Sequence, residues 1–576
     1  MDKKMLESYA IWAKKNLEQQ VEVSLNKIGI HSDTDIKKMH ISGDIATIDG
    51  DQTSYTLDFA NKRKSVVRMV ETDGYSTVIS ETAYTWFNRL IALRFMELHG
   101  YLSHGFRILS NPNNSVEPEI LKNLNLVKFD LSLDMDYCDK LKSDNRIEEL
   151  FRHVLLKQCQ VLSKTIPMLF SENTDAYELL LPNTLITGES VLTKLLEIPE
   201  ENFLDDVEVI GWLYQYYNTE QNKLVYNGKL SKEKIPKELI PAATTIYTPD
   251  WSVKYMVENS LGKLLSQMLP DFDTKSNWRY YLEDTTSKQE KTHSMSIEEV
   301  KFIDPCMGSG HILVYAFDVF MQIYRFCGYS DKDAVRSIII NNLYGLDIDK
   351  RAYQLACFAV IMRAQKYDKR FLRTLENEEL SLNLSHFQNL HIENVNFLDK
   401  PIQSLIEQFK NADTYGSIIK ITAQEGLEDY LESYVPTIDF DDEHEKHYYK
   451  LYQILTQKYE VICTNPPYLG SNRFNATLAD YTKKHFNDEK SDLSMVMFRH
   501  CVDSLSAQNG YIAFITTSSW FSLSSFEKLR KYIIMNYQIE SIVDYGTELF
   551  DGKVGHNPIV SWVLKKSHSI KKSYCY

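Results

Sequence analysis

The chain has 576 residues, a formal net charge of -15 and an isoelectric point near 5.6. This length is too great for a single hydrophobic core and predicts about three structural units. The negative net charge excludes a protein that binds a polyanion over its whole surface, because neutralisation of phosphates by lysine and arginine supplies most non-specific affinity for nucleic acids.

The start of the chain and its cysteines bear on the compartment. Met1-Asp2-Lys3-Lys4 opens a charged helix rather than a signal peptide, and no apolar run reaches the roughly 18 residues of a membrane span. The eight cysteines stand singly, without a C-x-x-C pair. We therefore expect a cytoplasmic protein with no membrane contact and no metal site.

Residues 1–240 predict a mostly helical domain. A small strand region is expected from Met39 to Phe59. Further on, the stretch from Ala83 to Met96 has apolar residues at three- and four-residue steps with Arg89 and Arg94 between them. This spacing predicts an amphipathic packing helix.

A glycine loop follows a short apolar run at Val300 to Ile303. The loop Asp304-Pro305-Cys306-Met307-Gly308-Ser309-Gly310 leads into His311 to Phe326, which has helical spacing. Strand, tight turn and helix in this order are typical of the ligand-binding end of a doubly wound sheet. The spacing is not G-x-G-x-x-G and an acid lies inside the loop, so S-adenosylmethionine, with its amine and sulfonium, fits better than a dinucleotide. A plain strand-to-helix turn is the alternative.

Leu343 to Asp349 predicts the second strand, after an extra helical stretch at Ser330 to Asn341. An acid at such a strand end commonly holds ribose hydroxyls, which favours Asp347 with Asp349 in reserve. Alternatively, both acids cap the helix that begins near Arg351.

The tetrapeptide Asn465-Pro466-Pro467-Tyr468 follows the strand-like run Tyr459 to Ile462. The amide oxygen of Asn465 and the carbonyl of Pro466 could each accept one N–H of an amino group on a base, which would aim its lone pair at a methyl donor. The two prolines hold these acceptors still, and the ring of Tyr468 can stack on a base turned out of a duplex. Prolines after a strand also make ordinary turns, and this reading remains open.

The order of these pieces resembles the adenine-N6 DNA methyltransferases of the gamma arrangement. The similarity runs from Pro241 to Lys565 and comprises, in order, Ile246-Tyr247-Thr248-Pro249-Asp250-Trp251, the glycine loop, the acid after the second strand, the Asn465 tetrapeptide, Asp492-Leu493, Gly510 to Trp520, and Ile542 to Leu564. The resemblance implies an α/β fold with a Rossmann-like seven-strand class I methyltransferase sheet. It also implies S-adenosyl-L-methionine as cofactor and double-stranded DNA, with a flipped adenine beside Tyr468, as partner.

Two upstream stretches narrow this resemblance. Ala83 to Met96 and Ile235 to Thr248 are similar to the PglX family, the adenine-specific methyltransferases of BREX phage-defence systems. This likeness implies a host-marking role and other defence-system proteins as partners.

The resemblance also implies the site residues. The catalytic set is Asn465, Pro466, Pro467 and Tyr468, and the cofactor-binding set is Tyr247, Thr248, Pro249, Asp304, Gly308, Gly310, Asp347, Ile348, Asn396 and Phe397. One departure is that Asn396 occupies the place where the family commonly has an acid that contacts the cofactor adenine. Asp399 is the alternative for this contact.

The expected domain limits are 1–240 for the helical domain and 241–576 for the methyltransferase domain, with an exposed, partly helical insertion at about 400–458. The chain stops where a C-terminal target-recognition domain is expected, so we expect target recognition to be absent or supplied by another polypeptide. Two alternative functions are a type IIG-like restriction-modification enzyme, for which residues 1–240 offer no Glu-x-Lys nuclease element, and a non-catalytic target-sensing subunit. A protein-glutamine methyltransferase is the weaker enzyme alternative.

Overall fold

The computed structural model describes residues 2–113, 115–170, 174–204, 207–226, 233–244, 246–283, 295–378, 380–387, 400–422, 442–550 and 558–566. The chain forms two compact units. The first consists of Met1–Tyr217 with Leu372–Glu378, and the second of Asn218–Phe371 with Glu379–Tyr576. The domain limits at residues 240 and 241 stay a prediction.

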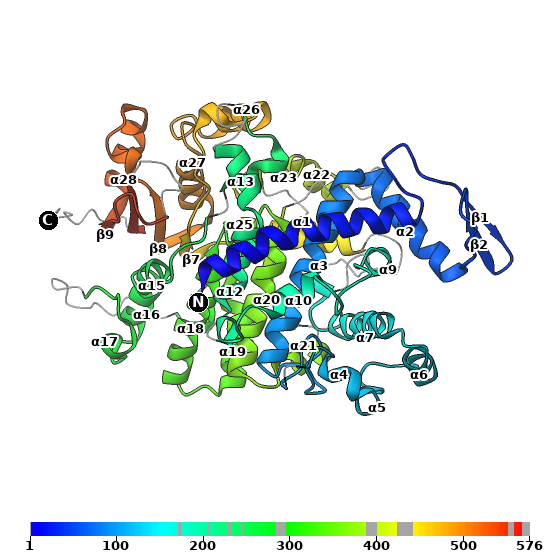
Figure 1. The fold of residues 1–576 in the computed structure, drawn as a ribbon. Coiled ribbons are helices and arrows are strands. Elements are labelled where there is room, and N and C mark those ends of the chain that lie inside the picture. The colour runs from blue at the N-terminus through cyan, green and yellow to red at the C-terminus, as the bar shows by residue number, and fades with distance from the viewer. Residues whose placement is uncertain are drawn as a thin grey trace. The chain divides into compact units, whose positions relative to one another are not determined.

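The first unit is mostly helical, as expected (Figure 1). Its helices are α1 (Lys3–Lys27), α2 (Leu57–Asp73), α3 (Tyr75–Leu98), α4 (Glu119–Lys122), α5 (Leu124–Val127), α6 (Met135–Ser143), α7 (Ile147–Leu162), α8 (Pro167–Phe170), α9 (Thr174–Leu179), α10 (Val191–Leu196), α11 (Glu201–Leu204) and α12 (Glu208–Tyr217). The α1 helix begins where the Asp2 side chain accepts hydrogen bonds from the N–H groups of Lys4 and Met5, which is an N-cap. The predicted strand region is confirmed as three short antiparallel strands, β1 (Met39–Ser42), β2 (Ile45–Ile48) and β3 (Tyr55–Thr56).

The prediction that Ala83 to Met96 is amphipathic is wrong. This stretch lies within α3, and every residue of it is buried. Arg89 donates hydrogen bonds to the carbonyls of Leu169 and Phe170, and Arg94 pairs with buried Glu97 at 2.6 Å. The two arginines therefore lie in the interior, because each has partners that offset the cost of burying its charge.

In the described parts of the chain, no helix combines the length and apolar character that crossing a bilayer requires.

The second unit is built on a seven-stranded sheet, which confirms the predicted fold class. The strands are β4 (Phe302–Asp304), β5 (Leu343–Asp347), β6 (Asn383–His386), β7 (Tyr459–Thr464), β8 (Ser506–Thr517), β9 (Tyr537–Asp544) and β10 (Ile559–Lys566), in the spatial order β6-β5-β4-β7-β8-β10-β9. All neighbours are parallel except β10, which is antiparallel to both β8 and β9. The strand order reverses between β4 and β7, and small ligands bind at such a switch point.

Helices cover both faces of this sheet. The helices α15 (Asp250–Glu258), α18 (His311–Phe326) and α20 (Lys350–Tyr367) contact one face, and α25 (Asp442–Thr456), α27 (Leu493–His500) and α28 (Glu527–Asn536) the other. The other α-helices among the described residues of this unit are α13 (Thr219–Tyr226), α14 (Ile240–Thr244), α16 (Leu261–Met268), α17 (Thr274–Asn277), α19 (Asp331–Ser337), α22 (Lys400–Gln408), α23 (Ala412–Tyr415) and α26 (Ala476–His485). Of α21 (Phe371–Glu378), residues Leu372–Glu378 belong to the first unit. The predicted helix from His311 to Phe326 is confirmed at both ends.

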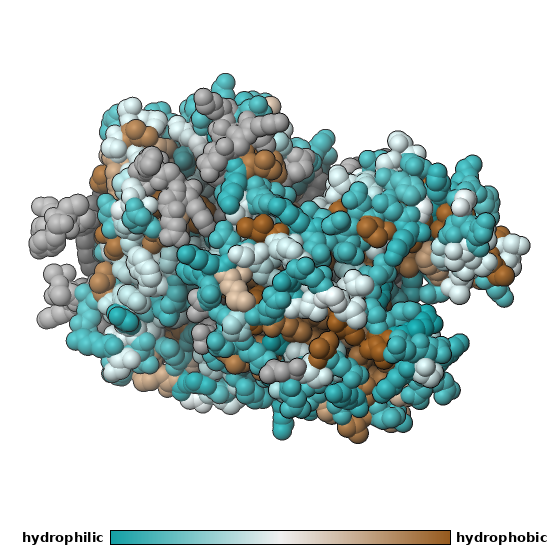
Figure 2. Space-filling view, viewed as in Figure 1, coloured by the Kyte–Doolittle hydropathy of each residue, from teal (hydrophilic) through white to brown (hydrophobic). Residues whose placement is uncertain are grey.

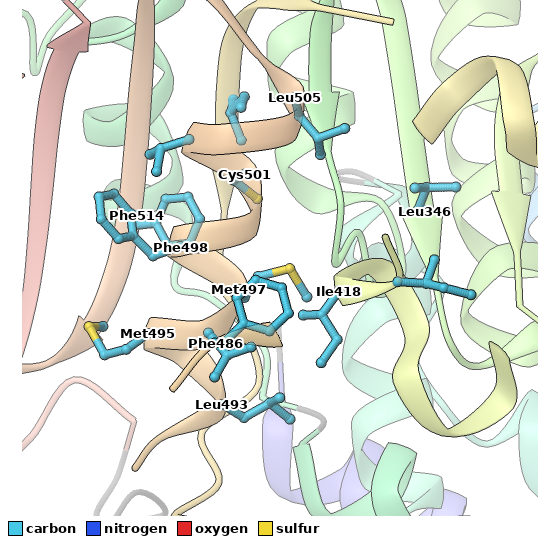
Figure 3. Packing of buried hydrophobic residues seen from close by; sticks show 14 of the residues in the cluster. Leu346, Ile418, Phe486, Leu493, Met495, Met497, Phe498, Cys501, Leu505 and Phe514 are labelled. Atoms are coloured by element: carbon cyan, nitrogen blue, oxygen red, sulfur yellow. The ribbon is translucent and has the colours of Figure 1, made fainter. Parts of the chain in front are cut away.

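The core on the α27 side contains residues from well-separated parts of the chain. Figure 3 shows Met497 on α27 beside Ile418, with Phe498 and Phe514 packed nearby and Leu346 of β5 in the same cluster. All five side chains are fully or almost fully buried. Burial of so many aromatic and aliphatic side chains fixes α27 on the sheet.

The segment predicted as an exposed insertion at 400–458 is helical in its described parts, but it is not exposed throughout. Leu451, Tyr452 and Leu455 of α25 are buried in the core of the sheet. Nearer the predicted cofactor site, Ser417 donates a hydrogen bond to the carbonyl of Pro305 in the glycine loop. These parts therefore support the sheet and the loop.

Candidate functional site

Asp304 and Thr464 join the carboxyl ends of the two central strands. The Thr464 hydroxyl donates a hydrogen bond of 2.6 Å to Oδ1 of Asp304, and the N–H of Cys306 donates to the same oxygen at 3.0 Å. The other oxygen, Oδ2, is buried and has no hydrogen-bond partner among the described residues. Since a buried carboxylate oxygen needs a donor or a cation, Oδ2 fits the ammonium group of a ligand.

The glycine loop turns through two left-handed residues, Gly308 (φ 53°) and Gly310 (φ 85°). A methyl group added at Gly308 would have no atom within 4 Å among its neighbours, so this residue borders open space. One added at Gly310 would lie 3.0 Å from the Cα atom of Ala356 on α20. Gly310 therefore permits close packing of two helices, whereas Gly308 leaves room for a ligand.

Asp347 and Asp349 have different roles at the end of β5. Asp347 accepts the N–H of Gly308 on Oδ2 and the N–H of Asp349 on Oδ1, both at 2.8 Å. Asp349 caps α20 by accepting the N–H of Arg351 at 2.9 Å, and it also pairs with the Arg351 guanidinium. The helix-cap alternative thus holds for Asp349 but not for Asp347. Ile348 between them is half-buried, and Gly416 packs against its side chain.

The two acids that line this loop titrate near neutrality. Burial raises the pKa of Asp304 to about 7, although the hydrogen bond from Thr464 lowers it. Burial likewise raises the pKa of Asp347 to about 7. A bound cation would favour the ionised forms, because it would replace the hydration that burial removes.

The Asn465 side chain is held at both ends. Its Nδ2 donates to the Thr248 hydroxyl at 3.0 Å, and its Oδ1 accepts the Tyr468 hydroxyl at 2.5 Å. The Tyr468 hydroxyl also lies 2.9 Å from the carbonyl of Ile515, while burial raises the pKa of this phenol well above its usual value. Tyr468 is therefore a protonated donor with two acceptors. Pro466 between them is buried and Pro467 half-buried.

The ring of Tyr468 faces that of Phe550, with ring centroids 6.0 Å apart and planes inclined at 44°. Both side chains are buried. A base that stacks on Tyr468 would have to enter beside Phe550 or displace it. The pair supplies aromatic surface at the place where the tetrapeptide predicts a base.

Tyr247, Thr248 and Pro249 lie between the glycine loop and the tetrapeptide. The Tyr247 ring stacks on His311, with ring centroids 4.8 Å apart and planes inclined at 13°. Nδ1 of His311 lies 3.1 Å from the carbonyl of Thr248, and Pro249 precedes the first turn of α15. The segment thus contacts both halves of the predicted site.

The structure brings the described members of the predicted site to one end of the sheet, around the ends of β4, β5 and β7. Asn396 and Phe397, predicted to contact the cofactor adenine, and the alternative Asp399 lie outside the described residues. Sequence reasoning missed Thr464, His311 and Phe550. The first two directly adjoin the motifs and could have been found from that position, whereas Phe550 is one aromatic in the connection between β9 and β10 and carries no local signal.

Comparison with known proteins shows what this chain is similar to. Residues 341–550 match the family model described as Eco57I restriction-modification methylase. The chain is 33% identical over 99% of its length to the adenine-specific methyltransferase BrxX of Escherichia coli O9:H4 (strain HS), and 33% identical over 96% of its length to the adenine-specific methyltransferase PglX of Lacticaseibacillus casei (strain Zhang). The resemblance inferred from the sequence is confirmed. The chain spans about half the length of these relatives, 51% and 49% respectively.

Solved structures show weaker likeness. The type ISP restriction-modification enzyme LlaBIII bound to DNA is 12% identical with a TM-score of 0.42, over 100% of this chain and 29% of that one. The type IIL restriction-modification enzyme MmeI in complex with DNA is 12% identical with a TM-score of 0.36, over 88% of this chain and 56% of that one. Values this low do not establish a common function.

Proposed function

We propose that this chain is the catalytic part of an S-adenosylmethionine-dependent DNA methyltransferase that acts on the N6 amino group of adenine. The observation that carries the proposal is that one hydrogen bond, from Thr464 to Asp304, joins the predicted cofactor site to the predicted site of the substrate amino group. Thr464 bonds the buried acid Asp304, whose second oxygen fits a cation, and directly precedes Asn465, whose amide oxygen can accept an amino group. Cofactor and acceptor would therefore meet between neighbouring strand ends.

The residues around the glycine loop fit S-adenosylmethionine by their chemistry. Asp304 would take its ammonium group, Gly308 would allow close approach of the backbone, and Asp347 would take the ribose hydroxyls. When bound, the cofactor supplies a methyl group activated by a sulfonium. The similarity to two relatives named as adenine-specific methyltransferases supports this choice.

The tetrapeptide would prepare the substrate. The exocyclic nitrogen of adenine is a poor nucleophile because its lone pair is delocalised into the ring. Asn465 Oδ1 and the Pro466 carbonyl would each accept one N–H and thereby hold the nitrogen with its lone pair directed at the methyl group. The base would reach them flipped from duplex DNA and would stack on Tyr468.

The proposed biological role is to mark host DNA in a BREX-type phage-defence system. The sequence similarity to PglX supports this role. Other defence-system proteins, or a recognition domain elsewhere, would then select the adenine that is methylated. The cofactor contacts of Asn396 and Phe397 belong to the same proposal.

The test is methyl transfer from tritiated S-adenosylmethionine to duplex DNA, with nucleoside analysis of the product. We expect N6-methyladenine from the native protein, measured in a preparation that includes its recognition component. Asn465→Ala is expected to lower the rate at least about 100-fold, because it removes an acceptor needed in the transition state, while cofactor affinity in calorimetry stays within about twofold. Transfer by Asn465→Ala at the native rate would refute the orienting role, and absence of S-adenosylmethionine binding by the native protein would refute the enzyme assignment.

A further inference from the structure

We propose that Thr248 is a positioning residue whose hydroxyl holds the Asn465 amide with its oxygen toward the substrate amino group. The family resemblance predicted Thr248 as a cofactor contact, and the geometry points to a different task for its side chain. This inference rests on the proposed function, because it concerns how the acceptor Asn465 is oriented.

Two acceptors face the nitrogen end of the amide. Nδ2 of Asn465 lies 3.0 Å from Oγ1 of Thr248 and 3.5 Å from the carbonyl of Ile246. A hydroxyl can donate or accept, whereas a backbone carbonyl can only accept. The Ile246 carbonyl therefore requires that the nitrogen end of the amide, and not its oxygen end, points toward residues 246–248. The shorter hydrogen bond to Thr248 holds the nitrogen in this position.

The oxygen end is constrained as well. Oδ1 of Asn465 accepts the Tyr468 hydroxyl, whose single proton can instead turn to the carbonyl of Ile515 at 2.9 Å. Oδ1 can thus receive a substrate N–H without leaving the tyrosine unpaired. A reversed amide would place Oδ1 against the Ile246 carbonyl and would present N–H groups to the substrate N–H groups. The reversed state cannot accept the amino group.

The backbone of Thr248 is itself anchored. Its carbonyl faces Nδ1 of His311 at 3.1 Å, and because this carbonyl can only accept, Nδ1 carries the proton. His311 is the first residue of α18 and directly follows Gly310 of the cofactor loop. Thr248 is buried, with 6% of its surface exposed. Thr248 therefore connects α18, the helix after the glycine loop, to the side-chain amide of Asn465.

The experiment compares Thr248→Val with Thr248→Ser. Valine keeps the shape of threonine but lacks the hydroxyl, so we expect single-turnover methyl transfer to fall by about 10- to 100-fold, the loss typical of a misplaced catalytic group. S-adenosylmethionine affinity by calorimetry should change less than about twofold. Serine restores the hydroxyl and should stay within about threefold of the native rate.

Thr244→Val is the matched control. The Thr244 hydroxyl bonds to the carbonyls of Ile240 and Pro241 at the end of α14, within its own helix turn. The same substitution four residues upstream should therefore leave both rate and affinity unchanged. A loss as large as that of Thr248→Val would attribute the effect to the segment and overturn the proposal.

Two other outcomes would also overturn it. An equal loss of cofactor affinity and rate in Thr248→Val would make Thr248 a cofactor contact, and an unchanged rate would remove its role. A crystal structure of Thr248→Val provides a test that does not depend on activity: the Asn465 amide should rotate away from Ile246 while the backbone of residues 465–468 stays in place, and an unmoved amide contradicts the proposal. If Asn465→Ala transfers methyl groups normally, the proposed function fails instead, whatever this amide does.

Discussion

At the scale of single residues, the candidate site contains a buried acid, Asp304, that is costly to ionise. Asp304 has one oxygen satisfied by Thr464 and Cys306 and another without a partner among the described residues. Because the pKa of Asp304 is raised to about 7, the native protein binds more protons than the unfolded chain between about pH 4 and 7. Its stability therefore falls as the pH rises through this window, unless a cation binds beside the carboxylate.

This cost gives the first prediction. We expect S-adenosylmethionine affinity to increase between pH 6 and 7.5, as Asp304 ionises, and Asp304→Asn to weaken binding at least about tenfold and to flatten the pH dependence. Asparagine keeps the bonds to Oδ1, so the melting temperature without cofactor at pH 8 should be unchanged or higher. Calorimetry and thermal unfolding measure the two effects. A variant that binds the cofactor as tightly as the native protein would contradict the role of Asp304.

At the scale of elements, the glycine loop combines a residue that borders open space with a residue that packs against a helix. Gly308 borders open space and donates its N–H to Asp347, whereas Gly310 lies against the backbone of Ala356. Both residues have positive φ, so replacing either glycine with another amino acid costs about 1 to 2 kcal/mol of folding free energy in backbone strain. Only at Gly310 does a steric clash with another helix add to this strain.

The two glycines therefore make a matched pair of variants. Gly310→Ala should lower the melting temperature more than Gly308→Ala, because α18 must shift away from α20. Gly308→Ala should weaken S-adenosylmethionine binding more than its small loss of stability explains, because the added methyl group occupies space expected for the ligand. Thermal unfolding and calorimetry on both variants decide this, and the reverse order of the two effects would refute the division of roles.

At the scale of the whole molecule, the negative net charge of the chain repels the proposed partner, duplex DNA. The net charge is -15, and the face in Figure 2 is mainly hydrophilic, with hydrophobic residues in scattered patches. Few phosphates can be neutralised by so acidic a chain, so affinity for DNA has to come from local contacts or from other polypeptides.

We therefore expect this 576-residue chain alone to bind duplex DNA of arbitrary sequence no more tightly than about 100 μM at 150 mM salt, at the weak end of non-specific binding. Affinity should change little with salt, because few counterions are released. Fluorescence anisotropy at several salt concentrations measures both quantities. Sub-micromolar binding with a steep salt dependence would show that the chain carries a phosphate-binding surface of its own.

Much of the architecture follows from local sequence patterns. The glycine loop, the helix from His311 to Phe326 and the strand before Asn465 were predictable, because apolar periodicity and glycine positions reflect short-range constraints. The burial of α3 on all sides was not predictable. Its two arginines resemble the polar face of an amphipathic helix until their partners, 80 or more residues away for Arg89, are known.

The sequence by itself determined the fold class and predicted where the candidate site lies, because the strand, turn and helix patterns, the glycine loop and the Asn465 tetrapeptide consist of consecutive residues whose backbone and side-chain chemistry act locally. Only the tertiary structure decided which atoms meet. Thr464 reaches Asp304 across 160 residues and Thr248 reaches Asn465 across 217. Such bonds depend on the register of neighbouring strands and on how helices pack over them, and no local pattern encodes either.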